Sequence, residues 1–469
     1  MTDAIRQKVP PWRYALGLVL ATVAIGGFWY PGSVIVRCIF DDTLRFGGVS
    51  PLAVSWHAAL TPRYEKWARA RIASGKAQHL DTSDISGTEW PLFGSDFYLW
   101  ATEHLQEGWE KDHGVSAVEP RQAAHGAIEA AVDLVIDPNS AGWVKKHWGE
   151  HYLDTEDAFY RMLVISALTS GETLTGSRAH EAFLRDQAEA FAKEIDASPT
   201  GLLTDYPGQC YPADVVASIA AIRRSDAFTQ ADHSAFAQRA QRGFEGTLLD
   251  PIGLPPYRAD ARTGEPAQWA RGCGNSYLIL RAHELWPERA AQWYATYEEH
   301  YWTDNWLTPG FREFPKEMPN RNWYFDVDAG PVLRGIGFAA SAFGVATARQ
   351  QGRFDHAYPL TIQMVALSWP LPNGRLLIPM ALSNGADAPM LGEAAILFTL
   401  TQPGTAKVVP SRWSVPGLVW ICLAFYFGAG AMFLRWAWRL VAGGTGGKRM
   451  KGAGGRGLRA KVEAGSPEG

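Results

Sequence analysis

The sequence is poor in cysteine and lacks the short motifs of several common enzyme classes. Its 469 residues include 4 cysteines, which is too few for a disulfide scaffold. No G-x-S-x-G elbow, G-x-x-x-x-G-K-[ST] loop or H-E-x-x-H pair occurs, so serine-hydrolase, P-loop NTPase and zincin chemistry are disfavoured. The chemistry that remains is that of carboxyl, tyrosine and thiol side chains, which serve as acid/base groups.

The four cysteines divide into two pairs. Cys38 and Cys422 lie in or beside long apolar segments, whereas Cys210 and Cys273 belong to the chain between those segments. In an oxidising compartment Cys210 and Cys273 could form one disulfide, and this alternative stands beside a catalytic use of either thiol.

The chain lacks the net positive charge that would indicate a polyanion partner. It also lacks the residue pattern that would indicate a metal site. Its formal net charge is −4 at pH 7. The Asp326-Val-Asp328 pair is without the flanking Asn, Gly and Glu of a calcium loop. The sequence therefore predicts no nucleic-acid partner, no metal and no cofactor.

Two long segments without charged residues are present, one near each end of the chain. Residues 14–30 follow three basic residues and end on Phe28, Trp29 and Tyr30, and residues 413–434 precede a basic, Gly-rich tail. Each segment is predicted to be a membrane helix, with a cleaved signal peptide as the alternative for the first. Basic residues at both ends favour cytoplasmic termini and contact with anionic membrane lipid.

These segments predict a two-helix inner-membrane protein whose main domain lies in the periplasm, if the cell is bacterial. The predicted parts are a cytoplasmic N-terminus with the first membrane helix (1–37), an extracytoplasmic domain (38–412), the second membrane helix (413–441) and a cytoplasmic tail (442–469). The oligomeric state is left open.

Apolar residues in the middle of the chain recur mostly with helical spacing. This spacing predicts helices at about 213–224, 229–247, 275–301 and 330–350, with the last beginning at Pro331, and the best strand candidate is 375–383. Long loops rich in Gly, Pro and Trp do not fit a short-looped bundle. We therefore expect an all-α domain built as an α/α toroid, in which loops at one rim carry side chains into a pocket.

The segment DYPGQCYPAD concentrates polar groups at the start of a predicted helix. Pro212 suits a first helical turn, so the loop before it would carry five side chains to one end of the ring: Asp205, Tyr206, Cys210, Tyr211 and Asp214. A helix N-terminus stabilises negative charge and lowers the pKa of a nearby thiol. The alternative is a purely structural role, in which Asp214 completes the first turn and Tyr206 packs on a proline.

Aromatic and acidic residues in other loops supply further candidates. Asp326 and Asp328 lie two apart in an extended segment, so at most one of them should face a pocket while the other caps or pairs. The candidates for substrate contact are Trp90, Phe93, Tyr98, His151, Tyr211, Cys273, Asn275, Trp323 and Asp326. Aromatic residues at helical spacing are often core, and His151 is equally suited to capping or to the surface.

Four segments together resemble the linalool dehydratase/isomerase-like domain, in a membrane-anchored form: TEWPLFGSDFYLWATEHL, EDAFYRMLVISALTSGETLTG, DYPGQCYPADVVASIAAI and DVDAGPVLRGIGFAASAFGVA. The likeness covers about residues 85–400. It implies an α6/α6 toroid and cofactor-free dehydration and isomerisation of a terpene alcohol by Asp, Tyr, His and Cys side chains. Cys210 matches a family cysteine most readily. No second cysteine lies nearby in the sequence, and the helix at 157–170 lacks the expected histidine.

Three functions follow as hypotheses. The first is a hydro-lyase or isomerase acting on a small alcohol, with Asp205 or Asp214 as one carboxyl group and Asp328 or Tyr206 opposite it. The second is a glycan-processing hydrolase or lyase on the same toroid. The third is a non-catalytic envelope binding protein.

Overall fold

The computed structural model describes residues 10–318, 321–405, 408–411 and 414–442. The described chain is mostly helical, with a few short strands, and two of its helices are long and apolar enough to cross a membrane. The first observation confirms the predicted helical character, and the second confirms that both apolar segments form long helices. The first nine residues and the tail after residue 442 lie outside the described residues, as does Trp413.

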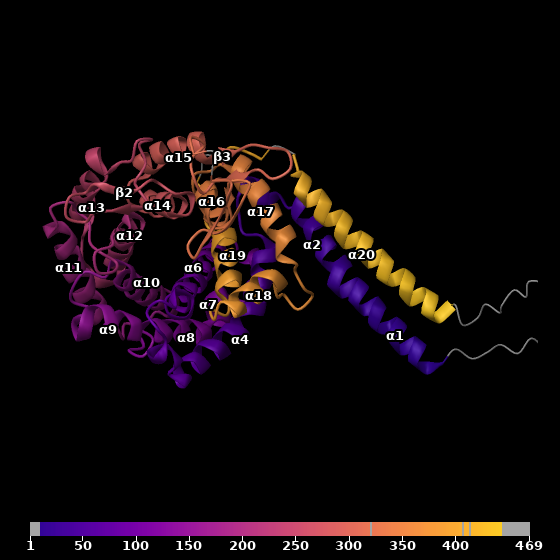
Figure 1. The fold of residues 1–469 in the computed structure, drawn as a ribbon. Coiled ribbons are helices and arrows are strands. Elements are labelled where there is room, and N and C mark those ends of the chain that lie inside the picture. The colour runs from indigo at the N-terminus through magenta and orange to yellow at the C-terminus, as the bar shows by residue number, and fades with distance from the viewer. Residues whose placement is uncertain (1–9, 319–320, 406–407, 412–413, 443–469) are drawn as a thin grey trace, which may run out of the picture.

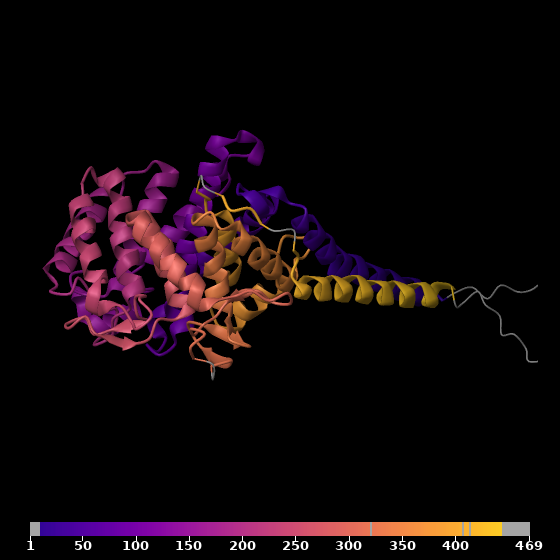
Figure 2. The same cartoon turned by 90° about the horizontal axis from the view of Figure 1, so that it is seen from above.

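The two long helices form an antiparallel hairpin that projects from the helical body (Figures 1 and 2). The first runs through α1 (Pro11–Thr22), a π-helical stretch (Val23–Trp29) and α2 (Tyr30–Ile39), and the second is α20 (Gly417–Ala442). Gly17 lies against Val441 and Gly430 against Trp29, because glycine lets two apolar helices approach closely. The first helix is longer than predicted at both ends, and the second begins later and extends further.

Six helices pack against one another in succession. They are α6 (Trp90–Lys111), α10 (Ala158–Thr175), α12 (Pro212–Thr229), α14 (Gly272–Leu285), α16 (Phe338–Gln350) and α19 (Leu391–Thr401). Each packs against the next in this order, and α19 packs against α6. Most of the α10 side chains are buried, apolar and polar alike, so this helix lies inside the body.

Other helices pack against the outside of these six. They are α4 (Pro51–Ser74), α8 (His125–Ile136), α11 (Glu181–Ala197), α13 (Ser234–Gln241), α15 (Pro287–Tyr301) and α17 (Phe354–Ser368). Shorter helices are α3 (Asp42–Phe46), α5 (Ile85–Thr88), α7 (Pro120–Ala123), α9 (Gly142–Trp148) and α18 (Leu377–Gly385).

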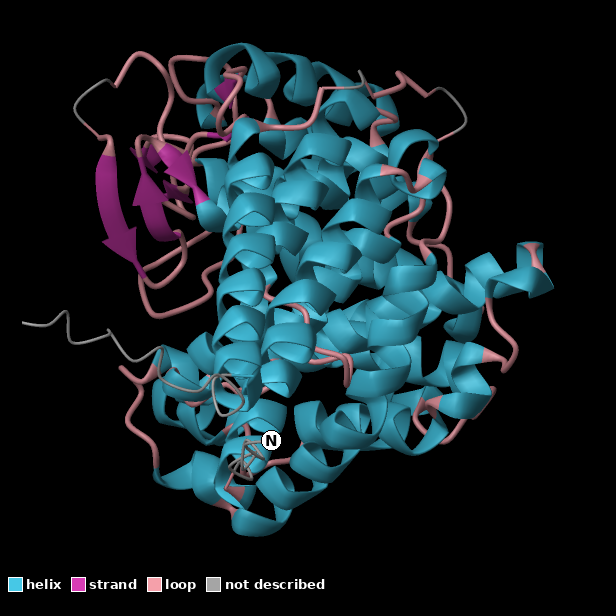
Figure 3. Cartoon of the chain, turned by 90° about the vertical axis from the view of Figure 1, so that its right-hand side faces the viewer, coloured by secondary structure: helices cyan, strands magenta, loops and turns pink. Residues whose placement is uncertain are grey.

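The strands are short and gather mainly at one edge of the body (Figure 3). Two antiparallel pairs join β1 (Arg258–Ala259) to β2 (Pro266–Gln268) and β3 (Trp302–Thr303) to β4 (Gly310–Phe311). A three-stranded antiparallel sheet contains β5 (Trp323–Asp326), β6 (Gly330–Leu333) and β7 (Ile336–Gly337), with Trp323 opposite Leu333.

Several predicted element boundaries were wrong, each for a physical reason. The predicted helix at 275–301 is two helices, because Pro287 starts a new first turn after Trp286. The segment after Pro331 is strand, since Gly330 and Gly335 adopt φ of 60° and 86° and turn the chain. The expected strand at 375–383 forms α18 instead, and the predicted helix at 229–247 shortens to α13.

Candidate active site

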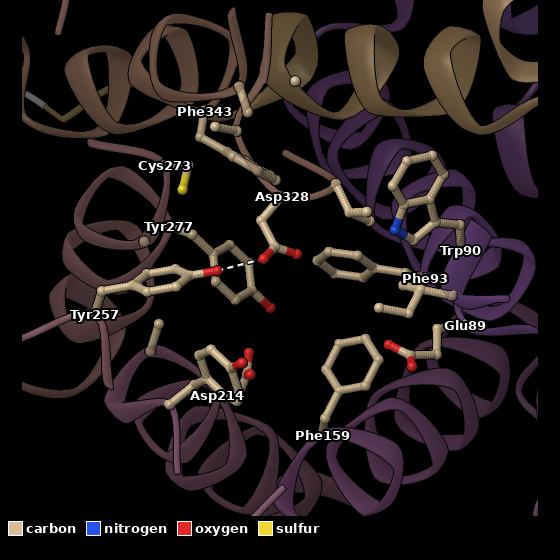
Figure 4. Close-up of a pocket in the computed structure, with 18 of the residues that line it drawn as sticks. Glu89, Trp90, Phe93, Phe159, Asp214, Tyr257, Cys273, Tyr277, Asp328 and Phe343 are labelled. Carbon is tan, nitrogen blue, oxygen red and sulfur yellow. Dashed lines mark hydrogen bonds between the residues drawn. The ribbon is translucent and has the colours of Figure 1, made fainter. Parts of the chain in front are cut away.

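A cavity of about 740 Å³ lies among one set of helix ends, and all six successively packed helices contribute to its wall. Figure 4 shows aromatic rings and three carboxyl groups directed into it. Most of its wall is apolar. Phe93 of α6 meets Phe159 of α10 and Tyr277 of α14 edge to face, with ring centroids 5.6 and 5.7 Å apart.

The α6 aromatic residues divide between the cavity and the core. Trp90 and Phe93, two of the candidates for substrate contact, line the cavity. Tyr98 does not, because it lies on another face of α6, stacked on His57 and Tyr64, and its hydroxyl bonds Thr61 at 2.9 Å. Tyr98 is therefore a core residue.

Asp214 and Asp328 face the same cavity from different elements. Asp214 lies in the first turn of α12, and Asp328 lies in the turn between β5 and β6, where it accepts a hydrogen bond from the Tyr257 hydroxyl (Figure 4). Burial, with a smaller contribution from Asp328, raises the pKa of Asp214 from 3.8 to about 7. Desolvation also raises the pKa of Asp328, and the Tyr257 hydrogen bond opposes that rise. Asp214 is thus able to hold a proton near neutral pH.

Glu89 is a third acid in the cavity and was not singled out from the sequence. It accepts a hydrogen bond from the predicted residue Tyr206 at 2.5 Å, while its other carboxyl oxygen has no partner among the described residues. Burial raises the pKa of Glu89 to about 8, and the Tyr206 hydrogen bond opposes the shift. In the sequence, Glu89 resembles an ordinary acid at a helix start.

Asp205 and Cys210 do not line the cavity, which corrects their predicted placement. Asp205 is buried behind the wall, and its carboxylate accepts the Tyr211 backbone N–H at 2.7 Å. This bond closes the loop that presents Tyr206 and Tyr211. Cys210 is also buried, and its carbonyl accepts the Ala259 N–H at 3.1 Å. Both residues therefore shape the loop.

Cys273 and Asn275 line the cavity at the start of α14. The Cys273 thiol donates to Glu313 Oε1 at 3.1 Å, and burial together with Glu313 raises the pKa of this thiol. The Asn275 side-chain amide donates to the Pro255 carbonyl at 3.0 Å, and its Oδ1 has no partner among the described residues. All four cysteines are free, so the alternative of a disulfide between Cys210 and Cys273 is wrong.

Three other candidates lie away from the cavity. Asp326 pairs with Arg271 at 2.8 Å while Asp328 faces the cavity, which is the division expected for residues two apart. Trp323 is exposed on the outer face of β5. His151 is exposed beside Asp154. A substrate in the cavity would not touch these three side chains.

Arg271 connects the turn that carries Asp328 with the segment that carries Tyr257. Its guanidinium donates a hydrogen bond to Glu313 at 2.7 Å and forms an ion pair with Asp326 at 2.8 Å. The guanidinium carbon lies 4.2 Å from the centroid of the Tyr257 ring. The Asp328 turn and the Tyr257 hydroxyl are thereby held together. Arg271 and Tyr257 gave no recognisable sequence signal, because their partners are distant in the chain.

Comparison with protein-family models and with curated proteins gives no match. The resemblance to linalool dehydratase/isomerase-like domains therefore stays a prediction. Among the described residues, no group of three or more His, Cys, Asp or Glu side chains is arranged to hold a metal ion.

The buried thiols give a first testable prediction. Burial raises the pKa of Cys210 and of Cys273, so neither is a reactive thiolate at pH 8. We expect a maleimide to leave both unmodified in the folded protein and to modify both after denaturation, as measured by peptide mass spectrometry. Modification of Cys210 in the folded state within minutes would contradict its placement behind the wall.

Proposed function

We propose that the chain is a membrane-anchored acid/base enzyme that dehydrates or isomerises a small, largely apolar alcohol without a cofactor, as its resemblance to linalool dehydratase/isomerase-like domains implies. The observation that supports this most directly is that Asp214 and Asp328 face one apolar cavity while their surroundings differ. Two carboxyl groups in different environments can act as acid and base at one pH.

The reaction requires one proton donor and one proton acceptor. Protonated Asp214 gives its proton to the alcohol oxygen as the C–O bond breaks and water leaves. Ionised Asp328 removes a proton from the neighbouring carbon, and the C–H electron pair forms the new C=C bond. One proton moves from Asp214 to Asp328 in each turnover, and its return through the released water resets both groups. The Tyr257 hydroxyl holds Asp328 in position.

The lining favours such an alcohol over a glycan. Phenylalanine side chains line much of the wall, including Phe93, Phe159 and Phe343, and Trp90 is the only tryptophan among the described lining residues. Carbohydrate sites commonly offer flat aromatic faces in an open groove, with two acids across it. This arrangement is better suited to a hydrocarbon skeleton carrying one hydroxyl.

The fold and the topology are part of the same proposal. Helices α6, α10, α12, α14, α16 and α19 would be the inner ring of an α/α toroid, a reading supported by their closed succession of contacts. Arg435 and Arg439 lie near the free end of the hairpin. By the positive-inside rule, that end faces the cytoplasm and the body lies on the other side, the periplasm of a bacterial inner membrane.

Two tyrosines offer a matched test of the site. Tyr257→Phe removes the hydroxyl that bonds Asp328 in the cavity, whereas Tyr324→Phe removes one that bonds Asp326 outside it. With purified full-length protein and a panel of allylic and tertiary C5–C15 alcohols, gas chromatography should detect alkene. We expect Tyr257→Phe to form it about tenfold more slowly and Tyr324→Phe to match the wild type.

Binding of the same alcohols without any alkene or isomer would instead identify the protein as a non-catalytic binding protein. Equal rates in the two variants would show that the Tyr257–Asp328 hydrogen bond has no part in the reaction.

A further inference from the structure

The part of the hairpin that projects free of the body is shorter than a bilayer core. Trp369, which follows α17, donates its indole N–H to the Gly27 carbonyl at 2.7 Å and packs on Phe28 with ring centroids 5.5 Å apart. From Pro11 to this contact there are about 16 residues, or roughly 24 Å of helix. The hydrocarbon layer is about 30 Å thick. If both helices cross it, the boundary of the layer must lie on the body's side of Trp369.

The hairpin surface at this level is itself apolar. Trp420 and Phe425 of α20 are 56% and 50% exposed, and Trp29 on the first helix is 42% exposed. These aromatic side chains lie on two helices that are long and apolar enough to cross a membrane, where they are expected to face lipid or its headgroup region rather than water. The level of Trp369 thus has the surface of a membrane segment.

The helix α18 begins a few residues after this contact. Pro372 lies against Gly26 of the hairpin, and Figure 1 shows α18 on the side of the body that faces the hairpin. On its inner side, Pro379 and Ser383 pack on Gly392, whose N–H donates to Ser383 Oγ at 2.9 Å. On its outer side, Ile378 and Leu382 are 40% and 69% exposed. The outward face is therefore apolar, the reverse of a surface helix in water.

We propose that α18 and the turn before it lie within the bilayer, in the leaflet on the side of the body. This inference rests on the proposed membrane anchorage of the hairpin. The sequence of α18, LIPMALSNG, has no charged residue, and the exposed Arg375 in the preceding turn can reach headgroup phosphates. Leu391 and Gly392, next to α18, line the cavity. One short helix then separates that part of the cavity wall from lipid.

Three variants of the full chain test the placement, each with one introduced cysteine and with the partly exposed Cys422 replaced by Ser. The other native cysteines, Cys38, Cys210 and Cys273, are buried. Leu382→Cys reports on α18, Val19→Cys on the hairpin, and Phe183→Cys on an exposed apolar position of α11 on the body. Each is labelled with an environment-sensitive nitrobenzoxadiazole and reconstituted in phosphatidylcholine–phosphatidylglycerol vesicles. Phosphatidylcholine carrying a nitroxide on carbon 5 of one acyl chain serves as the quencher. We expect quenching at positions 382 and 19 to be at least about threefold stronger than at 183.

The possible outcomes distinguish the placement of α18 from the membrane anchorage of the hairpin on which it rests. Quenching at 19 but not at 382 would overturn the α18 placement and leave the hairpin anchorage standing. A label at 382 shielded from aqueous iodide but not quenched by the lipid would point to a second protein chain on α18 and also overturn it. Absence of quenching at both positions would remove the anchorage together with the inference. The alcohol assay is measured separately and is affected by none of these results.

Discussion

Replacing Asp328 by Asn is expected to lower the rate of alcohol dehydration by about 10²- to 10⁴-fold, the range for loss of a general base. The amide keeps the size of the side chain and can still meet the Tyr257 hydroxyl, but it cannot take a proton from carbon. Asp214→Asn should have an effect of similar size, because the amide cannot donate a proton to the departing hydroxyl. Rates of alkene formation at saturating alcohol would measure both effects.

An exposed carboxyl group far from the cavity provides the control for these variants. Asp186 lies on α11 outside the cavity wall, so Asp186→Asn should retain the wild-type rate. Alcohol binding measured by calorimetry should change little in Asp214→Asn and Asp328→Asn, since the aromatic lining is intact. Wild-type turnover in either cavity variant would disprove its assigned role.

The pH dependence of the reaction follows from the raised pKa of Asp214. Asp214 must be protonated, so activity is lost as the pH rises through about 7. Activity is also lost at low pH, where Asp328 takes up a proton and can no longer act as the base. The same shift affects stability: the folded chain binds this proton more tightly than the unfolded chain, and the free energy of unfolding falls between about pH 4 and 7. Asp214→Asn should remove about 2 to 4 kcal/mol of that dependence, measured by urea unfolding in detergent at several pH values.

Residues close together in the sequence were the ones that local patterns could place. Pro212 marks the start of α12, and this boundary correctly directed Tyr211 and Asp214 to a helix end at the cavity. Asp205 was misplaced because a carboxylate that caps a nearby backbone N–H has the same sequence appearance as one that faces a pocket. Periodicity also could not identify α18, whose short apolar run fits either a strand or a helix.

Contacts between distant residues account for the rest of the site. Tyr257 and Asp328 bond across 71 positions, and Tyr206 and Glu89 across 117. No spacing rule connects such pairs, since they meet only when the helices have packed. The mostly helical character and the two long apolar helices were predictable because they depend on local composition. The acid that faces Tyr206 and the arginine that supports Asp328 were not.

Arg271 lies outside the cavity, and its loss should destabilise the fold. Its side chain and that of Glu313 are 7% and 0% exposed, and they form a buried ion pair. Arg271→Met should lower the free energy of unfolding by about 3 to 5 kcal/mol, because it leaves the Glu313 carboxylate buried without its cation. Urea unfolding in detergent, followed by tryptophan fluorescence, measures the change.

A second substitution distinguishes the loss of charge balance from the loss of packing. Burial raises the pKa of Glu313, and Arg271 opposes that rise. In Arg271→Met the Glu313 carboxyl should therefore hold its proton to higher pH, so the destabilisation should grow as the pH increases. Adding Glu313→Gln to Arg271→Met should restore at least about half of the lost stability and remove the added pH dependence.

Because Tyr257 and Asp326 would still lack the guanidinium between them, this double variant should remain slow in the alcohol assay. A double variant that regained full activity would show that Arg271 stabilises the fold without positioning Asp328.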